Sequence, residues 1–338
     1  MLKKIYNLVL YNYTIKKIAH KALQNKFVVN NFFYKKTYER IIRRKIAQFD
    51  KLPYRLMIEN TNACNSDCVF CPHPIMRRRV GIMDFGLYEK IVRQARGLNI
   101  DYLTIYGFGE PLLDPYFFKR VKLAKELGIG RVTTNTNGSL LNKDKIKNII
   151  VSGLDEIYIS FDANSDSTYK KIRPALDFKT VARNIRTMAY AKKKYRFKKP
   201  EIVLSFVRPP TNTDEVSGYI KKWSKIVNHI SISELHNWTG QVENESGNIL
   251  AKQKRDPCRL LWTDMTIDWL GRVVLCCTDY ESQEVLGDLN FQTIREIWSG
   301  KKLANFRQDH LQGNFNNIKL CADCSYNLHH KSPFWVGK

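Results

Sequence analysis

The chain has no hydrophobic run long enough to cross a membrane. A membrane-spanning helix needs about 20 apolar residues. The longest run near the start, residues 5–10, is interrupted by Asn7 and follows Lys3 and Lys4. This run is also too short for the apolar core of a secretory signal peptide, and no small-residue cleavage site follows it. We therefore expect a cytoplasmic protein.

Acidic residues are few relative to basic ones. The 338 residues contain 32 Asp and Glu against 56 Lys and Arg, a formal net charge of +24. Such an excess attracts anions, including phosphorylated substrates. Hydrophobic residues make up 43% of the chain and aromatic residues 12%. These globular values exclude wholesale disorder, a collagen-like repeat and a coiled coil, and the length predicts about two domains.

Cysteine is absent from residues 72–257, and this gap separates two groups of cysteines. Without an export signal, such a set is more typical of metal binding or catalysis than of disulfides. The gap therefore predicts two separate sites. The groups are Cys64, Cys68 and Cys71, and then Cys258, Cys276, Cys277, Cys321 and Cys324.

The first group has the spacing C-x3-C-x2-C on a polar loop that follows a predicted strand. The number of thiolates is informative, because four cysteines close a [4Fe-4S] cluster whereas three leave one iron open. A zinc site that borrows His73 as a fourth ligand is one alternative. Ordinary buried cysteines are the other.

This motif, with Phe70 before its third cysteine, resembles the signature of the radical S-adenosylmethionine (radical SAM) superfamily. Other landmarks of the family follow in order. They are Gly107-Phe-Gly109-Glu110-Pro111, a slight departure from the family's Gly-Gly-Glu-Pro turn, then Asn137-Gly138, Ser160-Phe-Asp162 and Arg173. The resemblance implies that the three cysteines hold a [4Fe-4S] cluster with an open iron that binds SAM. It also implies a set of SAM-binding residues, namely Phe70, Gly107, Gly109, Glu110, Pro111, Asn137, Ser160, Asp162 and Arg173.

The second group resembles the C-terminal iron–sulfur extension called SPASM, which has a Gly-x4-Cys element and an Ile-Trp helix. Gly271 to Cys276 and Ile294 to Trp298 match these elements. The full SPASM form has seven cysteines and two auxiliary clusters, but no cysteine follows Cys324 here. This predicts the shortened twitch form with one auxiliary [4Fe-4S] cluster, as in 2-deoxy-scyllo-inosamine dehydrogenase-like enzymes. The implied metal ligands are Cys258, Cys276, Cys321 and Cys324.

Spacing alone also allows a four-cysteine zinc site for this second group. Cys277 is left over from the implied ligand set. It is a small buried residue, a hydrogen-atom donor of the kind used by epimerases of the superfamily, or an alternative ligand.

Alternating β and α patterns favour a parallel sheet with right-handed crossovers. Six predicted strands fit the α/β fold that the resemblance implies, a partial (β/α)6 TIM-like barrel with a small C-terminal iron–sulfur domain. The predicted strands are 54–60, 102–107, 131–136, 156–162, 201–207 and 229–235. The predicted helices are 84–98, 115–127, 142–152, 177–195 and 213–227, with Asp84, Asp114, Asn142 and Asn212 or Thr213 as caps.

We predict four regions along the chain. They are a basic helical N-terminal extension (1–50), a radical SAM core barrel (51–240), a linker (241–257) and a SPASM/twitch-type domain (258–338). The extension has a net charge of +10. It is interpreted as a solvated, partly docked helical segment or as a basic amphipathic anchor at the membrane's inner face. We do not expect nucleic acid as its partner, since no RNA- or DNA-binding motif is present.

The resemblance implies reductive cleavage of SAM to a 5′-deoxyadenosyl radical, which removes a hydrogen atom from the substrate. We expect the auxiliary cluster to accept a second electron and a flavodoxin- or ferredoxin-type protein to supply the first. The predicted reaction is oxidation (dehydrogenation) or epimerisation of a sugar-like substrate, phosphorylated or linked to a nucleotide or lipid. The candidates for a catalytic base, chosen by position near strand ends, are His236, Tyr106 and Glu234.

Two alternatives to this function stay open. Radical modification of a ribosomal peptide is the first, although the N-terminal extension lacks the β-hairpin pattern of a winged-helix leader-binding domain. The second belongs to another class: a non-catalytic metal-binding module with a basic nucleic-acid-binding tail. Such a module would not need the Gly107–Pro111 turn or a three-cysteine open site.

Overall fold

A computed structural model describes residues 51–240, 255 and 257–326 of the chain. The N-terminal extension (1–50), most of the linker and the last residues of the C-terminal domain therefore lie outside the described residues. The expectations for the extension as a docked helix, a membrane anchor or a nucleic-acid tail lie outside them too. Within the described part, no helix is both long enough and apolar enough to span a bilayer.

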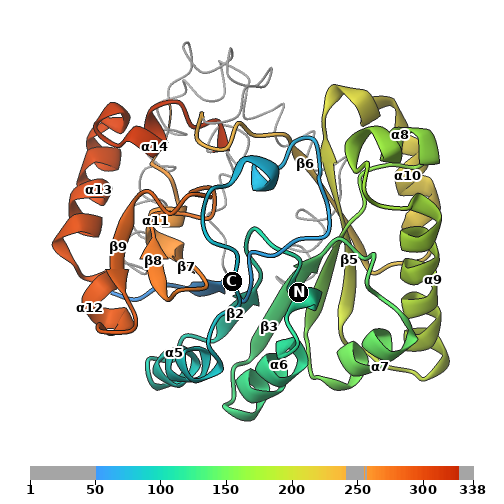
Figure 1. Cartoon of the computed structure of the whole chain (residues 1–338), viewed down its shortest axis with the longest axis horizontal. Coiled ribbons are helices and arrows are strands. Elements are labelled where there is room, and N and C mark those ends of the chain that lie inside the picture. Colours follow the sequence, from blue (N-terminus) through green and yellow to red (C-terminus); the bar gives the residue numbers. More distant parts are fainter. Residues whose placement is uncertain (1–50, 241–254, 256, 327–338) are drawn as a thin grey trace, which may run out of the picture.

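The described residues form one nine-stranded sheet, in the order β6-β5-β4-β3-β2-β1-β7-β8-β9 (Figure 1). Strands β1 to β6 pair in parallel with their sequence neighbours and do not close into a full barrel. The α/β partial barrel is thus confirmed. These strands are β1 (Arg55–Ile58), β2 (Tyr102–Ile105), β3 (Arg131–Thr136), β4 (Glu156–Ser160), β5 (Glu201–Arg208) and β6 (His229–Glu234).

The C-terminal cysteine region continues the same sheet. Strand β7 (Asp264–Ile267) pairs in parallel with β1, on the edge opposite to β2. Strands β8 (Arg272–Val274) and β9 (Val285–Asp288) then add in antiparallel fashion. Strand β1, which leads into the first cysteine loop, is therefore the strand that joins the two regions.

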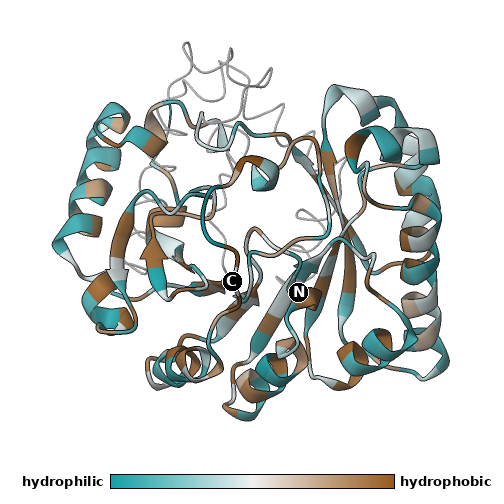
Figure 2. Cartoon of the chain, viewed as in Figure 1, coloured by the Kyte–Doolittle hydropathy of each residue, from teal (hydrophilic) through white to brown (hydrophobic). Residues whose placement is uncertain are grey.

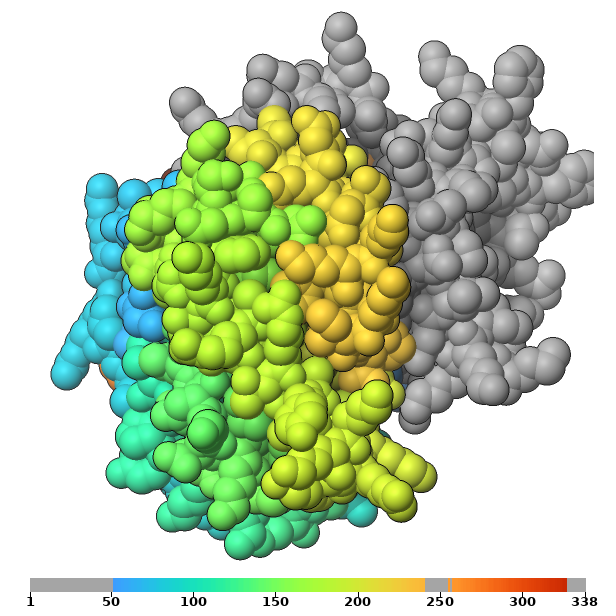
Figure 3. Space-filling model, turned by 90° about the vertical axis from the view of Figure 1, so that its right-hand side faces the viewer, coloured from blue at the N-terminus to red at the C-terminus, as the bar shows by residue number. Residues whose placement is uncertain are grey.

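Helices cover the outer face of the parallel strands, and α8, α9 and α10 form the side seen in Figure 3. Their apolar stripes explain this packing: α9 buries Val181, Ile185 and Met188 at helical spacing. The longer helices are α5 (Phe85–Gly97), α6 (Phe117–Glu126), α7 (Lys143–Val151), α8 (Asp166–Ile172), α9 (Phe178–Lys194), α10 (Val216–Trp223), α12 (Ile294–Trp298) and α13 (Lys301–Gln312). The short helices are η1 (His73–Ile75), η2 (Pro111–Leu113), η3 (Pro210–Glu215), α11 (Leu260–Thr263), η5 (Phe315–Asn317) and α14 (Lys319–Ala322).

Two of the predicted helix caps are confirmed. The Asp84 carboxylate accepts a hydrogen bond from the backbone N–H of Leu87 at the start of α5. The Asn142 side chain accepts one from Lys145 at the start of α7. Each satisfies a backbone donor that the first helical turn leaves unpaired.

The other cap predictions were wrong. Asp114 ends η2, and its carboxylate pairs with Arg120 at 2.7 Å, so α6 begins only at Phe117. Asn212 is buried, and its side-chain amide donates hydrogen bonds to the backbone carbonyls of Asp162 and Val207. Thr213 lies within η3. Helix α8 was not predicted at all.

Side-chain alternation gives the sheet two different faces. Leu56, Ile58, Ile157 and Ile159 point toward the helices and belong to the hydrophobic core. Figure 2 shows apolar segments, in brown, along the strands. The opposite face looks into the open barrel, which we call the lumen. Its positions on β4, β5 and β6 are mostly polar and half-buried.

Candidate active site

Cys64, Cys68 and Cys71 lie on the loop that leaves the carboxyl end of β1. This is the end where α/β barrels place their active sites. Burial raises the pKa of the Cys64 thiol to about 11 and that of Cys71 to about 12; neighbouring cysteines contribute less and backbone hydrogen bonds oppose the rise. The three cysteines lie within eight residues of one loop. Because iron binds the thiolate, cluster binding must displace their protons.

Arg173 ties Cys68 to the barrel wall. Its Nη1 donates to the Cys68 Sγ at 2.9 Å, and its Nε donates to the Asp162 carboxylate at 2.7 Å. Asp162 is fully buried and also accepts the backbone N–H of Val207. Asp162 thus acts on the cysteine loop through Arg173, whose guanidinium also lies 5.8 Å from the centre of the Phe70 ring.

The two glycines of the predicted turn permit close approach to the cysteine loop. A Cβ on Gly109 would lie 2.5 Å from the carbonyl oxygens of Thr61 and Ala63. A Cβ on Gly107 would lie 2.5 Å from the Cγ of Glu59. No side chain fits at Gly109 without moving the backbone that leads to Cys64, and none fits at Gly107 without displacing the Glu59 side chain, which explains the requirement for glycine.

Glu110 and Asn137 connect the glycine turn, the third strand and the cysteine loop. The buried Glu110 carboxylate accepts the Thr136 hydroxyl and the Asn137 backbone N–H, each at 2.7 Å. Burial raises the pKa of this carboxyl, and these hydrogen bonds oppose the rise. The Asn137 amide donates to Asn65 Oδ1 at 2.8 Å. Pro111 starts η2 and is buried next to Glu110.

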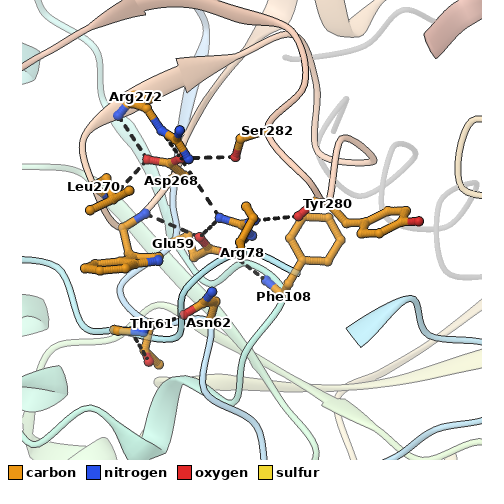
Figure 4. Close-up of polar contacts among 12 residues, drawn as sticks. Glu59, Thr61, Asn62, Arg78, Phe108, Asp268, Leu270, Arg272, Tyr280 and Ser282 are labelled. Atoms are coloured by element: carbon orange, nitrogen blue, oxygen red, sulfur yellow. Dashed lines mark hydrogen bonds and ion pairs between the residues drawn. The ribbon is translucent and has the colours of Figure 1, made fainter. Parts of the chain in front are cut away.

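A network that the sequence did not reveal joins this site to the C-terminal region (Figure 4). The buried Glu59 carboxylate accepts both terminal nitrogens of Arg78, at 2.9 and 3.0 Å. It also accepts the backbone N–H groups of Phe108 and Trp269. The Nε of Arg78 also donates a hydrogen bond to the backbone carbonyl of Tyr280. The only sequence signal was an acidic residue at a strand end, and nothing local indicated its partners.

The second set of four cysteines lines a single cavity. Cys258, Cys276, Cys321 and Cys324 all border it, and its other walls are largely apolar. Cys277 does not border it. Cys277 instead lies beside Asp264 and Arg55, and burial raises the pKa of its thiol to about 12. The geometry therefore supports four ligands, with Cys277 retained as a protonated thiol.

Among the described residues, no three His, Cys, Asp or Glu side chains converge closely enough to hold a single metal ion. A four-iron cluster binds its cysteines at separate iron atoms and so spreads their sulfurs more widely than one ion does. The zinc alternatives, which need such a single-ion site, gain no support from the described residues.

His310 is a further residue that the sequence did not single out. Its Nδ1 accepts the backbone N–H of Cys258 at 3.1 Å, and its Nε2 lies 3.3 Å from the Cys321 Sγ. A ring nitrogen that accepts a backbone N–H carries no proton. The proton is therefore on Nε2, which donates to the sulfur of Cys321.

Replacing His310 by phenylalanine is expected to lower the reduction potential of the auxiliary cluster and to weaken its retention about 10- to 100-fold. The reason is that hydrogen bonds to ligand sulfurs stabilise the reduced cluster. A redox titration followed by electron paramagnetic resonance, on a chain with Cys64, Cys68 and Cys71 changed to alanine, isolates this cluster. His310→Gln is the matched control because it retains an N–H donor. A potential that is equal in the phenylalanine variant and the parent would contradict the assignment.

The three candidate bases differ in position. Strand alternation places Glu234 on the face of Ile230 and Ile232, away from the lumen, where it pairs with Arg208. Tyr106 faces the lumen, but burial raises the pKa of its hydroxyl, which keeps it protonated. His236 contacts the ring of Trp238, whose indole N–H donates to the Phe70 carbonyl at 2.7 Å. His236 thus lies next to the cysteine loop.

Comparison with known families agrees with this geometry. Residues 58–216 match the family model of the radical SAM superfamily, and residues 258–325 match that of the SPASM iron–sulfur cluster-binding domain. The chain belongs to the radical SAM superfamily and carries a SPASM domain. The interpretation as a non-catalytic metal-binding module is therefore not supported.

The chain is also similar to individual members of the superfamily. It is 23% identical over 279 residues to an S-adenosyl-L-methionine-dependent 2-deoxy-scyllo-inosamine dehydrogenase of Niallia circulans, covering 82% of this chain and 94% of the relative. It is 33% identical over 197 residues to a probable GTP 3′,8-cyclase of Saccharolobus solfataricus. That match covers 56% of this chain and only 60% of the relative.

Solved structures show the same fold at low identity. BtrN in complex with AdoMet and 2-DOIA superimposes with a TM-score of 0.58 at 20% identity, over 81% of this chain and 94% of that one. Streptococcus suis SuiB bound to its precursor peptide SuiA gives 0.63 at 13% identity, over 79% and 70%. These likenesses support the fold but do not identify a substrate.

This radical SAM protein therefore binds a 4Fe-4S cluster, SAM and an auxiliary iron–sulfur cluster. The observed geometry fits these groups. Three neighbouring thiols follow β1, and four thiols share one cavity. Ser160, at the carboxyl end of β4, is half-buried, and its hydroxyl has no hydrogen-bonding partner among the described side chains. The assignment of individual residues to each group is our proposal.

Proposed function

We propose that this enzyme dehydrogenates a secondary alcohol of a small, hydroxyl-rich, sugar-like substrate in the lumen. A row of serines carries this proposal. Ser160 on β4 pairs in register with Ser205 on β5, which pairs with Ser231 on β6. All three face the lumen, and all three are half-buried.

Adjacent strands are about 4.8 Å apart, so the three hydroxyls form a straight row across the lumen wall. None of them has a hydrogen-bonding partner among the described side chains. Half-buried hydroxyls without partners can bind the hydroxyl groups of a ligand, since each can both donate and accept. The near-complete overlap with the 2-deoxy-scyllo-inosamine dehydrogenase supports the same substrate class.

SAM and the reduced cluster held by Cys64, Cys68 and Cys71 would supply a 5′-deoxyadenosyl radical to remove one hydrogen atom from the carbinol carbon of the substrate. Conversion to a ketone then requires the loss of one proton and one electron. In this proposal His236 accepts the proton at Nδ1, after releasing the backbone N–H of Trp238 that it holds at 3.3 Å. A cluster held by four cysteines would have no open iron to bind substrate. We therefore assign it the role of accepting the electron.

The test uses the full chain, reconstituted anaerobically, with SAM, dithionite and two panels of substrates. One panel contains aminocyclitols and free, phosphorylated or nucleotide-linked sugars, and the other contains cysteine- or serine-containing peptides. We expect only the first panel to yield equal amounts of 5′-deoxyadenosine and ketone. Turnover of peptides alone would overturn the proposal. Incorporation of solvent deuterium without oxidation, abolished in Cys277→Ser, would indicate epimerisation instead.

Replacing Ser205 by alanine is expected to raise KM for the sugar-like substrate about three- to tenfold. One neutral hydrogen bond contributes about 0.5–1.5 kcal/mol. Substrate-free cleavage of SAM, measured as 5′-deoxyadenosine, should remain unchanged. Ser217→Ala, an exposed serine on α10, is the matched control. An unchanged KM in Ser205→Ala would remove the serine row from the substrate site.

A further inference from the structure

A second cavity lies at the opposite end of the barrel from the cysteine loop. It is bordered by the carboxyl end of α9, the loop that follows it and the amino ends of β5 and β6. Its volume is about 310 Å³. A water molecule needs only about 10–15 Å³ by the same measure, so the cavity can hold a polyatomic ligand.

Three cationic side chains border this cavity, and no acidic residue is among the described residues that line it. They are Lys192, Lys193 and Arg196. The Lys193 and Arg196 side chains come from exposed positions, so that solvent reduces the cost of their charges. Their convergence gives the cavity a local positive charge that attracts anions.

Lys192 is the unusual member because it is only 7% exposed. Its ammonium donates to the neutral Asn228 side-chain oxygen at 3.0 Å. That same oxygen already accepts the backbone N–H of Ile202. The Glu201 carboxylate acts on Lys192 only at longer range and bonds His229 at 3.2 Å. A buried charge without a direct ion pair is costly. Among the described residues no carboxylate pairs directly with Lys192, so an anion in the cavity would lower this cost.

We propose that this cavity binds a phosphate group. A tetrahedral dianion would neutralise Lys192 and accept charge-assisted hydrogen bonds from Lys193 and Arg196, which are stronger than neutral ones. The site is independent of the catalytic chemistry, because it lies at the amino ends of the strands. Its ligand is either a soluble phosphate compound or a phospholipid headgroup.

Exposed aromatic residues near the cavity help to distinguish a phospholipid headgroup from a soluble phosphate compound as its ligand. Tyr190, Tyr195 and Phe197 are 65%, 62% and 43% exposed. They alternate with basic residues at the end of α9 and in the loop that follows it. Exposed aromatic and cationic side chains together are typical of surfaces that contact lipid headgroups.

The experiment titrates inorganic phosphate into the full, cluster-loaded chain by anaerobic calorimetry. We compare the wild type with Lys192→Met, Arg196→Asn and the control Lys147→Met, an exposed lysine on α7. Arg196 has a positive φ of 56°, which asparagine tolerates, so this variant removes the charge without straining the loop. We expect saturable binding that weakens about tenfold or more in the two cavity variants only.

A second arm measures sedimentation with phosphatidylcholine vesicles, with and without phosphatidylglycerol. A headgroup ligand predicts binding to the anionic vesicles that Lys192→Met, Arg196→Asn and Phe197→Ser reduce and that Lys147→Met leaves intact. A soluble ligand predicts that Phe197→Ser leaves phosphate affinity unchanged and that vesicles do not bind. Failure of both probes to bind saturably, or equal binding by all the variants, would overturn the proposal.

Discussion

Replacing Arg173 by methionine is expected to destabilise the protein by about 3–5 kcal/mol. This is the usual cost of removing one partner from a buried ion pair, since Asp162 would be left unpaired at 0% exposure. The same change removes the donor 2.9 Å from the Cys68 sulfur. Retention of the primary cluster should therefore fall about 10- to 100-fold as well.

Two measurements separate these effects. Urea unfolding of the apo-protein reports the free energy of unfolding, and iron content with electron paramagnetic resonance after reconstitution reports the cluster. Arg183→Met, at an exposed position on α9, is the control. The double variant Asp162→Asn/Arg173→Met should recover much of the stability but not the cluster. Recovery of both would mean that Arg173 has no direct role toward Cys68.

Replacing Glu59 by alanine is expected to lower the free energy of unfolding by a similar amount, about 3–5 kcal/mol, and also to weaken SAM binding. Arg78, whose side chain is 6% exposed, would lose its bidentate partner and keep only the longer ion pair with Asp268, at 4.0 Å. The backbone N–H of Phe108 would lose its acceptor, so the Gly107–Gly109 turn would no longer be held against the cysteine loop. We expect SAM affinity to fall about tenfold, equivalent to about 1.4 kcal/mol.

Equilibrium dialysis with SAM and urea unfolding test this expectation. Glu89→Ala is the matched control, because Glu89 pairs with Arg93 on the exposed face of α5 and such pairs contribute less than about 1 kcal/mol. Glu59→Gln should bind SAM better than Glu59→Ala, since its amide oxygen still accepts from Phe108. If SAM affinity is intact in Glu59→Ala, the Glu59–Arg78 network stabilises only the contact between the barrel and the C-terminal region.

Local patterns in the sequence predicted most of the fold. All six barrel strands are where alternating and apolar runs placed them, within a few residues. The caps Asp84 and Asn142 followed from the preference of short polar side chains for helix starts. Asp114 has the same local signature, but a buried arginine six residues later competes for its carboxylate. Tertiary pairing therefore prevailed over the local preference.

The cysteine spacing and the glycine turn predicted the candidate site because both depend on residues close in sequence. The rest of the site depends on contacts that no local pattern encodes. Glu59 meets Arg78 and Trp269, which lie 19 and 210 residues further along the chain. His310 is directed at Cys321 by a helix and a turn, and the serine row exists only through strand register.

The parallel pairing of β1 with β7 also has a consequence for synthesis of the protein. Arg55 and Asp264, at the start of this pairing, are 209 residues apart. At about 5–20 residues per second, the ribosome needs roughly 10–40 s to make the stretch between them. For that time one edge of the apolar strand β1 has no partner and can pair with other chains. We expect this interval to be the aggregation-prone stage of biogenesis, so slow translation at low temperature should depend most on chaperones that cover exposed strand edges.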